Sequence, residues 1–326
     1  MFIIIVLLSQ FTGSCLCSNL LLSLYEQVDK SKLENLTLLE ITNLETNLFR
    51  IVDHNNKYQN SLFSMNINRF IYNNSIKIIE NNKLHIGNNA DNRVIIGDLI
   101  TNSLNPFIES FDYREYNIIS TPKDQLECGS CWAFAISSSA ESIYALNTGI
   151  LVELSPQQVL DCTEKINNCK GGYFDSIMNM FKKSWLSEHK IYPYTAAKNP
   201  CKNLKKVVDK PKFIYNGYAY IKKNDDIGLQ QALLKYGPLP VSITITPKFM
   251  FYEKGIFDDI ECENKAVNHA VVLVGYGISE GGTEYWVLKN SWGVDWGENG
   301  FFRIKKGNNF CGITDNAIVP FFNFIE

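Results

Sequence analysis

The chain has 326 residues, of which 45% are hydrophobic and 20% charged, so it can bury a sizeable core and lacks the composition of a disordered chain. Its formal net charge of −3 excludes the strongly basic surface that nucleic-acid binding requires. Nine cysteines stand against only four histidines. Because nine is odd, disulfide pairing leaves at least one thiol over unless processing removes some cysteines.

The first residues predict a cleaved signal peptide over 1–18. An apolar run over 2–8 precedes a small and polar stretch over 9–18, and the run is too short to span a bilayer. The alternative is a buried N-terminal strand. We therefore expect a soluble protein of the secretory pathway, without stable membrane insertion, that is secreted or delivered to a lysosome-like acidic compartment. Cleavage would remove Cys15 and Cys17, and the oxidising compartment would permit disulfides among the rest.

Residues 19–106 contain no cysteine and no tryptophan and are rich in asparagine. Apolar residues at helical spacing predict an amphipathic helix here: Ile41, Leu44, Leu48, Ile51 and Val52. Asn35 and Asn73 begin Asn-x-Ser/Thr triplets and are glycosylation acceptors if the chain is secreted. The polar stretch 81–106 is typical of a mobile connection open to proteolysis.

After residue 110 the chain becomes rich in cysteine, tryptophan, glycine and aromatic residues. The spacing over 131–147 predicts a helix that ends at Gly149, and it should be buried because only Glu141 in it is charged. Short runs over 271–277, 285–289 and 301–305 predict strands of an antiparallel sheet. A helical first half followed by a β-rich second half indicates an α+β architecture of two lobes.

Cys131 lies at the start of the predicted helix. The helix dipole and nearby backbone N–H groups favour the thiolate there, which makes this cysteine the candidate nucleophile. The pair Cys128-x-x-Cys131 is equally compatible with a redox pair or half of a zinc site. A thiol–disulfide oxidoreductase is therefore a rival from another functional class.

Three distant residues favour nucleophilic catalysis. His269 begins a predicted strand and can act as general base and acid for a thiol. Asn290, on the next predicted strand, can orient the imidazole through its side-chain carbonyl. Gln125 can place an amide N–H where a tetrahedral intermediate develops negative charge, together with the backbone N–H of Cys131.

These motifs give the chain a clear resemblance. With Cys128-Gly-Ser-Cys-Trp132, the block from Asn290 to Gly300 and the Cys311-Gly-Ile ending, the chain resembles the papain-like cysteine proteases of the cathepsin L type after residue 110. The segments 235–240 and 300–303 look like those of the viral cathepsins of insect baculoviruses. The resemblance implies a two-lobe papain-like fold with the site in the cleft between a helical N-terminal lobe and an antiparallel C-terminal lobe.

It also implies a division of the chain and a function. Residues 19–106 would be a mostly helical inhibitory propeptide, removed near 104–110, and residues 107–326 the peptidase domain. The chain would be a cysteine endopeptidase without cofactor or metal, with an apolar P2 preference. Its partners would be protein and peptide substrates, its own propeptide and cystatin-like inhibitors, and it would be a monomer. A catalytically silent papain-fold binding protein is the second alternative.

The resemblance assigns roles to individual residues. The catalytic set would be Gln125, Cys131, His269 and Asn290, with Trp292 covering the His–Asn hydrogen bond and lining the leaving-group side. The implied substrate-binding residues are Gly171, Gly172, Tyr173, Phe174, Asn268, Ala270 and Asn316. The implied disulfides are Cys128–Cys169, Cys162–Cys201 and Cys262–Cys311. The first of these would make Cys128 unavailable to Cys131 and so dismiss the redox alternative.

Two residues depart from the family pattern. Leu126 replaces the glycine that usually follows the glutamine, so we expect a different backbone path there, and Tyr113 stands where tryptophan is usual.

Overall fold

The computed structural model describes residues 23–24, 26–33, 35–57, 61–81, 108–164, 169–174, 186–202 and 213–324. The predicted signal peptide and residues 104–107 of the predicted processing region 104–110 lie outside the described residues. Among the described helices, none is both long enough and apolar enough to cross a membrane.

The N-terminal region consists of helices α3 (Lys30–Leu33), α4 (Leu38–Lys57) and α5 (Ser75–Asn81), the short strand β1 (Phe63–Met65) and the 3-10 helix η1 (Arg69–Tyr72). The helix predicted from the apolar spacing is α4. It begins with a capping box, because the Thr37 N–H donates to Glu40 Oε2 at 2.8 Å and the Glu40 N–H donates to Thr37 Oγ1 at 3.3 Å. Its apolar stripe is fully buried over most of its length, at Leu44, Leu48, Ile51 and Val52.

The larger sheet has the order β1-β5-β8-β7-β6-β2, with β4 paired to β6 beside that path. Its strands after β1 are β2 (Phe111–Asp112), β4 (Leu239–Ile243), β5 (Tyr252–Phe257), β6 (His269–Ile278), β7 (Glu284–Lys289) and β8 (Phe301–Lys305). Every pair is antiparallel except β5 with β8. The sequence predicted β6, β7 and β8 to within two residues at each end.

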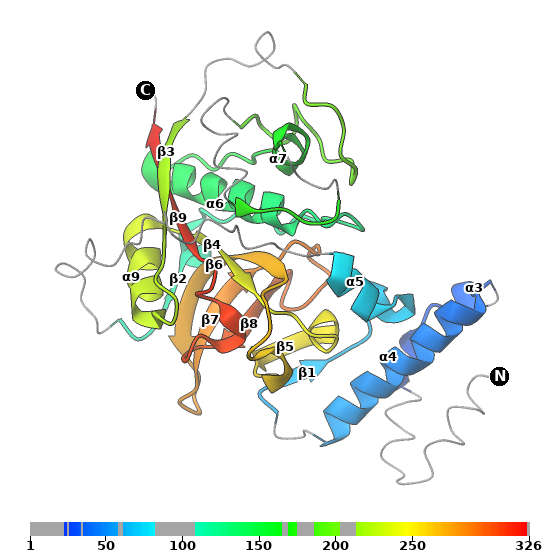
Figure 1. Cartoon of the computed structure of the whole chain (residues 1–326). Coiled ribbons are helices and arrows are strands. Elements are labelled where there is room, and N and C mark those ends of the chain that lie inside the picture. The colour runs from blue at the N-terminus through cyan, green and yellow to red at the C-terminus, as the bar shows by residue number, and fades with distance from the viewer. Residues whose placement is uncertain are drawn as a thin grey trace.

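The helical part of the chain after residue 107 is built on α6 (Cys131–Thr148) and α7 (Pro156–Cys162). Gly149 ends α6 with a φ of 73°, and the helix is buried along most of its length, as its lack of charge predicts. The strands β3 (Phe213–Tyr220) and β9 (Ile318–Phe324) form a separate antiparallel ribbon beside α6 (Figure 1).

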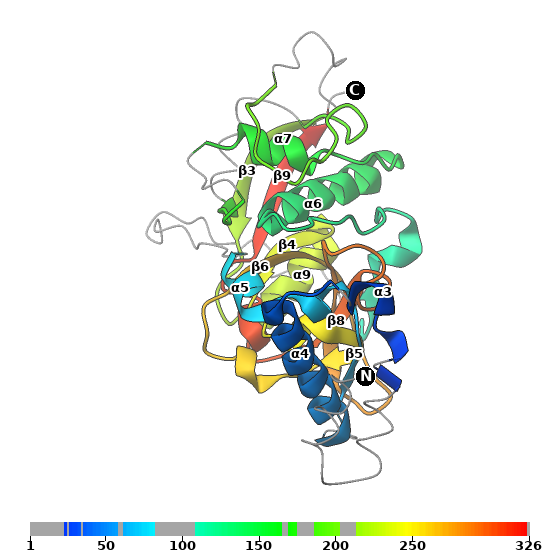
Figure 2. The same ribbon diagram turned by 90° about the vertical axis from the view of Figure 1, so that its right-hand side faces the viewer.

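Helix α9 (Asp226–Tyr236) packs on the larger sheet, and four further 3-10 turns join the elements: η3 (Tyr113–Tyr116), η4 (Phe249–Phe251), η5 (Ile260–Cys262) and η6 (Phe310–Gly312). The helices α6 and α7 lie at one end of the molecule and the sheet at the other, which is the predicted α+β arrangement of two lobes (Figures 1 and 2). Buried side chains form one core around the sheet and another around α6 and α7.

The N-terminal region extends the sheet of the second lobe. Strand β1 pairs with β5, with Phe63 opposite Gly255. Gly255 has a φ of 101°, and a Cβ there would come within 2.2 Å of the Leu62 carbonyl oxygen, so a side chain would block this pairing. Figure 2 shows α4 in front of β5 and β8.

Candidate active site

Cys131 is the first residue of α6, with Ser130 at the N-cap position. It is fully buried and is the free cysteine within the described part of the chain. The backbone amide of Ala270, on β6, acts on the thiol and lowers its pKa. The contact between α6 and β6 therefore brings the residue after His269 against the thiol.

His269 and Asn290 lie at the ends of two neighbouring strands. His269 begins β6, Asn290 directly follows β7, and the antiparallel pairing of the strands places their side chains together. His269 Nε2 lies 2.8 Å from Asn290 Oδ1, while no hydrogen-bond partner is present for Nδ1 among the residues described. The Trp292 ring covers the imidazole, with 4.9 Å between the ring centroids.

Burial shifts both titratable groups toward their neutral forms. The pKa of the Cys131 thiol is raised to about 11 because the residue is desolvated, although the amides of Ala270 and Trp132 oppose the rise. Burial likewise lowers the pKa of His269 to about 4, and its hydrogen bond to Asn290 opposes this shift. The amides at the start of α6 favour the thiolate, as expected, but desolvation of the buried thiol is the larger effect in the full chain and favours the neutral form.

Gln125 is buried in a loop that is fastened to the segment after Asn290. Its Nε2 donates to the Cys128 carbonyl at 2.9 Å, and its Oε1 accepts a hydrogen bond from Ser291 Oγ at 2.7 Å. Its backbone N–H donates to the Ser291 carbonyl at 2.9 Å. These bonds hold the glutamine beside the helix start that carries Cys131.

Leu126 and Tyr113, the two departures from the family pattern, adapt differently. Leu126 takes the left-handed conformation that favours glycine, with a φ of 52°, and its side chain is exposed. Tyr113 is buried, and its hydroxyl donates to the Leu233 carbonyl at 3.1 Å.

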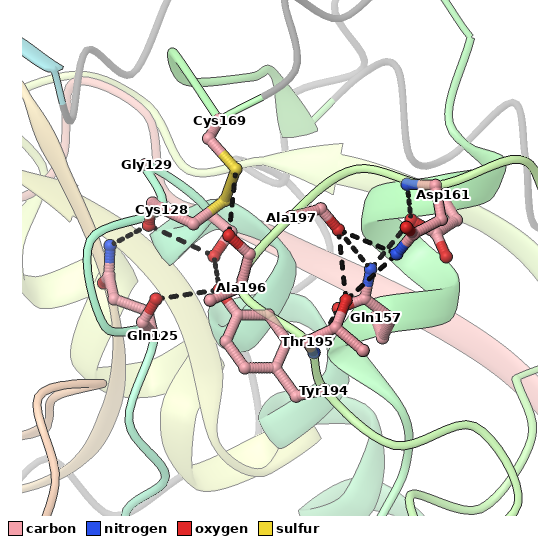
Figure 3. The surroundings of a disulfide bond; sticks show 12 residues. Gln125, Cys128, Gly129, Gln157, Asp161, Cys169, Tyr194, Thr195, Ala196 and Ala197 are labelled. Carbon is pink, nitrogen blue, oxygen red and sulfur yellow. Dashed lines mark hydrogen bonds between the residues drawn. A yellow bond between two sulfur atoms is a disulfide. The ribbon is translucent and has the colours of Figure 1, made fainter.

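The structure contains three disulfides, and they join the pairs that the resemblance implies: Cys128–Cys169, Cys162–Cys201 and Cys262–Cys311. With Cys128 bonded to Cys169, it cannot form a redox pair with Cys131. Near this bridge the Tyr194 hydroxyl donates to the Gln125 carbonyl at 2.8 Å and lies 2.7 Å from Ser130 Oγ (Figure 3). Tyr194 thus joins the glutamine loop to the start of α6, a contact that the sequence analysis missed.

The implied substrate-binding residues occupy different environments. Gly172 lies against Trp132, where a Cβ would come within 2.4 Å of the indole, and Gly171 has a φ of 97°. The Asn268 side chain pairs with the backbone of Ile245 in both directions, at 2.8 and 3.1 Å. The remaining implied residues are buried or nearly so: Tyr173 half-buried, and Phe174, Ala270 and Asn316 buried.

A buried polar cluster that the sequence analysis did not identify lies next to Asn290. Lys289 Nζ donates to Ser120 Oγ at 2.8 Å and to Ser138 Oγ at 2.6 Å, and burial lowers its pKa to about 8. Ser120 in turn donates to the carboxylate of Glu141, the one charge of α6. The sequence signal was Glu141 itself, an acidic residue in an otherwise uncharged helix.

The N-terminal region reaches this site through η1. Arg69 makes a two-pronged ion pair with Asp124, the residue before Gln125, and its Nη2 lies 2.7 Å from Asp124 Oδ1. The Phe70 ring meets Trp292 edge-on, with 5.1 Å between centroids. Asn68 Nδ2 donates to the Met250 carbonyl at 2.7 Å. Across the described ranges there is no group of three or more His, Cys, Asp or Glu side chains arranged to hold a metal ion.

The chain is similar to known proteins along most of its length. It is 41% identical over 214 residues to a viral cathepsin of Adoxophyes honmai nucleopolyhedrovirus, which covers 64% of this chain and 60% of that protein. It is 37% identical over 225 residues to pro-cathepsin H of Mus musculus, which covers 66% of this chain and 65% of that protein. These matches span less than two thirds of the length of either relative.

Solved structures match both the N-terminal region and the rest of the chain. The digestive procathepsin L 3 of the Tenebrio molitor larval midgut superposes with a TM-score of 0.77 at 30% identity and covers 94% of this chain and 99% of its own. The stem bromelain precursor superposes with a TM-score of 0.74 at 30% identity and covers 91% of this chain and 94% of its own. The family model for papain family cysteine protease matches residues 107–321. The chain therefore belongs to the papain family of cysteine proteases.

Proposed function

We propose that the chain is the inactive proform of a cysteine endopeptidase that hydrolyses peptide bonds through a thioester on Cys131. One observation carries the proposal. The free thiol at the start of α6 lies against the strand that begins with His269, whose other ring nitrogen is 2.8 Å from Asn290 Oδ1. This is the arrangement of nucleophile, base and orienting group that acyl transfer requires.

Each residue has a defined part in the proposed reaction. Asn290 Oδ1 accepts a hydrogen bond from the Nε2–H of His269, which leaves Nδ1 unprotonated and able to take the thiol proton. The Cys131 sulfur then attacks the peptide carbonyl, and Gln125 with the Cys131 N–H stabilises the oxyanion. His269 donates its proton to the leaving amine, and it afterwards activates the water that hydrolyses the thioester.

The N-terminal region, residues 19–106, is the proposed inhibitory propeptide, and 107–326 is the proposed peptidase domain. The pairing of β1 with β5 and the contacts of Arg69 and Phe70 beside the site support this division, as does the match to the Tenebrio procathepsin. Entry into the secretory pathway through a signal peptide over 1–18, glycosylation at Asn35 and Asn73, and residence in an acidic compartment or outside the cell belong to the same proposal. The three disulfides are compatible with that route.

The proposed preference is for an apolar P2 side chain. Phe174 and Ala270 are buried and apolar, and the Asn316 position carries no acidic group. Peptide substrates and a monomeric state belong to the proposal, as do cystatin-like inhibitors.

A fluorogenic dipeptide substrate with phenylalanine at P2 tests the function. The processed chain should cleave it, an epoxide inhibitor of cysteine proteases should abolish cleavage, and Cys131→Ala should show none. Gln125→Ala should lower kcat by about 10²–10³, the usual effect of one oxyanion donor. A processed chain that neither cleaves the substrate nor reacts with the epoxide would instead be a silent binding protein of this fold.

A further inference from the structure

Asp124 carries a carboxylate at the edge of the candidate active site. It directly precedes Gln125 and forms an isolated antiparallel bridge with Trp292. A Cβ on Gly293, the residue after Trp292, would lie 3.6 Å from Asp124 Oδ2. The carboxylate therefore lies between the glutamine loop and the tryptophan that the family resemblance places on the leaving-group side.

The protein's own N-terminal region already places a basic side chain on this carboxylate. Arg69 binds both oxygens of Asp124, and the adjacent Phe70 packs on Trp292. Two neighbouring residues of a covering segment thus occupy the carboxylate and the indole together. Bidentate pairing of guanidinium with carboxylate is among the stronger charge-assisted hydrogen-bond arrangements.

The carboxylate is held in position without Arg69. The Leu126 N–H donates to Asp124 Oδ1 at 2.8 Å, within the same loop. The neighbouring Lys123 does not neutralise it, because Lys123 Nζ pairs with Glu141 at 3.0 Å and Glu153 at 3.6 Å. In the described part of the chain Arg69 is the one ion-pair partner of Asp124, so loss of the N-terminal region would leave a fixed negative charge beside the site.

We propose that Asp124 is a specificity-determining residue that selects substrates with a basic side chain at the first or second position after the scissile bond. The inference rests on the proposed function, because it assigns a substrate feature to the same site. In the full chain Arg69 fills this position, and in the processed enzyme a substrate arginine or lysine replaces it.

The test uses the processed enzyme and internally quenched peptides that are identical up to the scissile bond and carry Arg, Gln or Glu at either of the two following positions. At one of these positions kcat/KM should be about fivefold higher for Arg than for Glu, as expected for a partly exposed ion pair. The Arg/Glu ratio should fall toward one in Asp124→Asn, which retains an acceptor for the Leu126 N–H. It should persist in Asp295→Asn, which removes an equal charge from the exposed segment after Trp292.

Reading a ratio within each variant cancels any change in overall rate. A second measurement needs no variant: the Arg/Glu ratio of the unmodified enzyme should decrease at 0.5 M salt, since exposed charge pairs are screened (the Debye length is about 3 Å at 1 M). Cleavage of the dipeptide substrate with equal kcat/KM for all quenched peptides would overturn this inference alone. Failure to cleave the dipeptide substrate would overturn the proposed function and the inference with it.

Discussion

At the scale of single residues, the Cys131 thiol is subject to two opposing effects. The start of α6 and the amides of Ala270 and Trp132 favour the thiolate, whereas complete burial favours the thiol. Burial is the larger effect, since the pKa rises from 9 to about 11. The position of Cys131 at a helix start could be predicted from the sequence, but its burial depends on residues far along the chain that pack over it.

The raised pKa predicts how Cys131 reacts in the full chain. Because only the thiolate is alkylated, the rate of modification by iodoacetamide should increase about tenfold per pH unit from pH 7 to pH 10. Mass spectrometry of the peptide that contains Cys131 measures this rate. After removal of the N-terminal region the rate at pH 7 should be higher, and a pH-independent rate in the full chain would contradict the raised pKa.

The left-handed backbone conformation of Leu126 predicts that glycine at this position stabilises the protein. A residue with a Cβ costs about 1–2 kcal/mol in the left-handed region, and glycine loses about 0.5–1 kcal/mol more chain entropy on folding. Leu126→Gly should therefore raise the free energy of unfolding by about 0.5–1 kcal/mol in urea titrations of the Cys131→Ser chain. Leu126→Ala keeps the Cβ and serves as the control. Equal stabilities of the two variants would show that the backbone conformation carries no strain.

At the scale of elements, patterns in the sequence locate those strands that have a glycine boundary or an alternating pattern. β6, β7 and β8 are of this kind. β4 is buried at all five positions and so shows no alternation, and it was not predicted. β1 exists through its pairing with β5, which lies about 190 residues further along the chain, and no local pattern signals it.

The residues of the candidate site also divide into those that local sequence patterns locate and those that only the folded structure brings together. The spacing of Cys131, His269 and Asn290 points to one site because each residue lies at the start or end of a predictable element. Arg69 and Asp124 lie in a 3-10 turn and a loop, and only the docking of η1 brings them together. Such a contact is a property of the folded chain alone.

We expect the side chain of Asn47, in α4, to hold η1 in place. Its buried Nδ2 donates to the carbonyls of Ile71 at 2.9 Å and Asn73 at 3.0 Å. Asn47→Ala should cost about 2 kcal/mol by leaving these acceptors without their donor, so amides of residues 69–73 should exchange with deuterium about 30-fold faster. Asn43→Ala, which removes one longer bond to the Tyr72 carbonyl at 3.2 Å, should have a smaller effect. Equal exchange in both variants would contradict this role of Asn47.

At the scale of the whole molecule, all the described histidines make the folded chain less stable in acid. His54, His189 and His269 all have pKa values lowered mainly by burial. Each binds a proton more readily in the unfolded chain, so unfolding takes up protons as the pH falls below 6.5. Stability is therefore lost on acidification in a pH range where most carboxylates are still ionised.

His54 connects this effect to the N-terminal region. It lies in α4 with Nε2 3.2 Å from the Phe63 carbonyl, and its ring packs on that of Phe63 in β1, 4.3 Å between centroids. Lys248 lowers the pKa of His54 further, whereas the carboxylates of Asp259 and Asp258 raise it. Protonation of His54 would place a charge where α4, β1 and the sheet meet.

The acid response of the full chain can be measured in the Cys131→Ser variant, which lacks the candidate nucleophile. With a folded pKa of about 4, His269 alone should reduce the free energy of unfolding by about 2 kcal/mol between pH 6.5 and pH 5. Urea titrations at both pH values measure this loss, and the slope against pH gives the number of protons taken up. His54→Gln, which keeps a hydrogen-bonding side chain but does not titrate, should reduce that number without abolishing the loss. Equal stability at pH 6.5 and pH 5 would mean that the buried histidines are not held neutral in the folded chain.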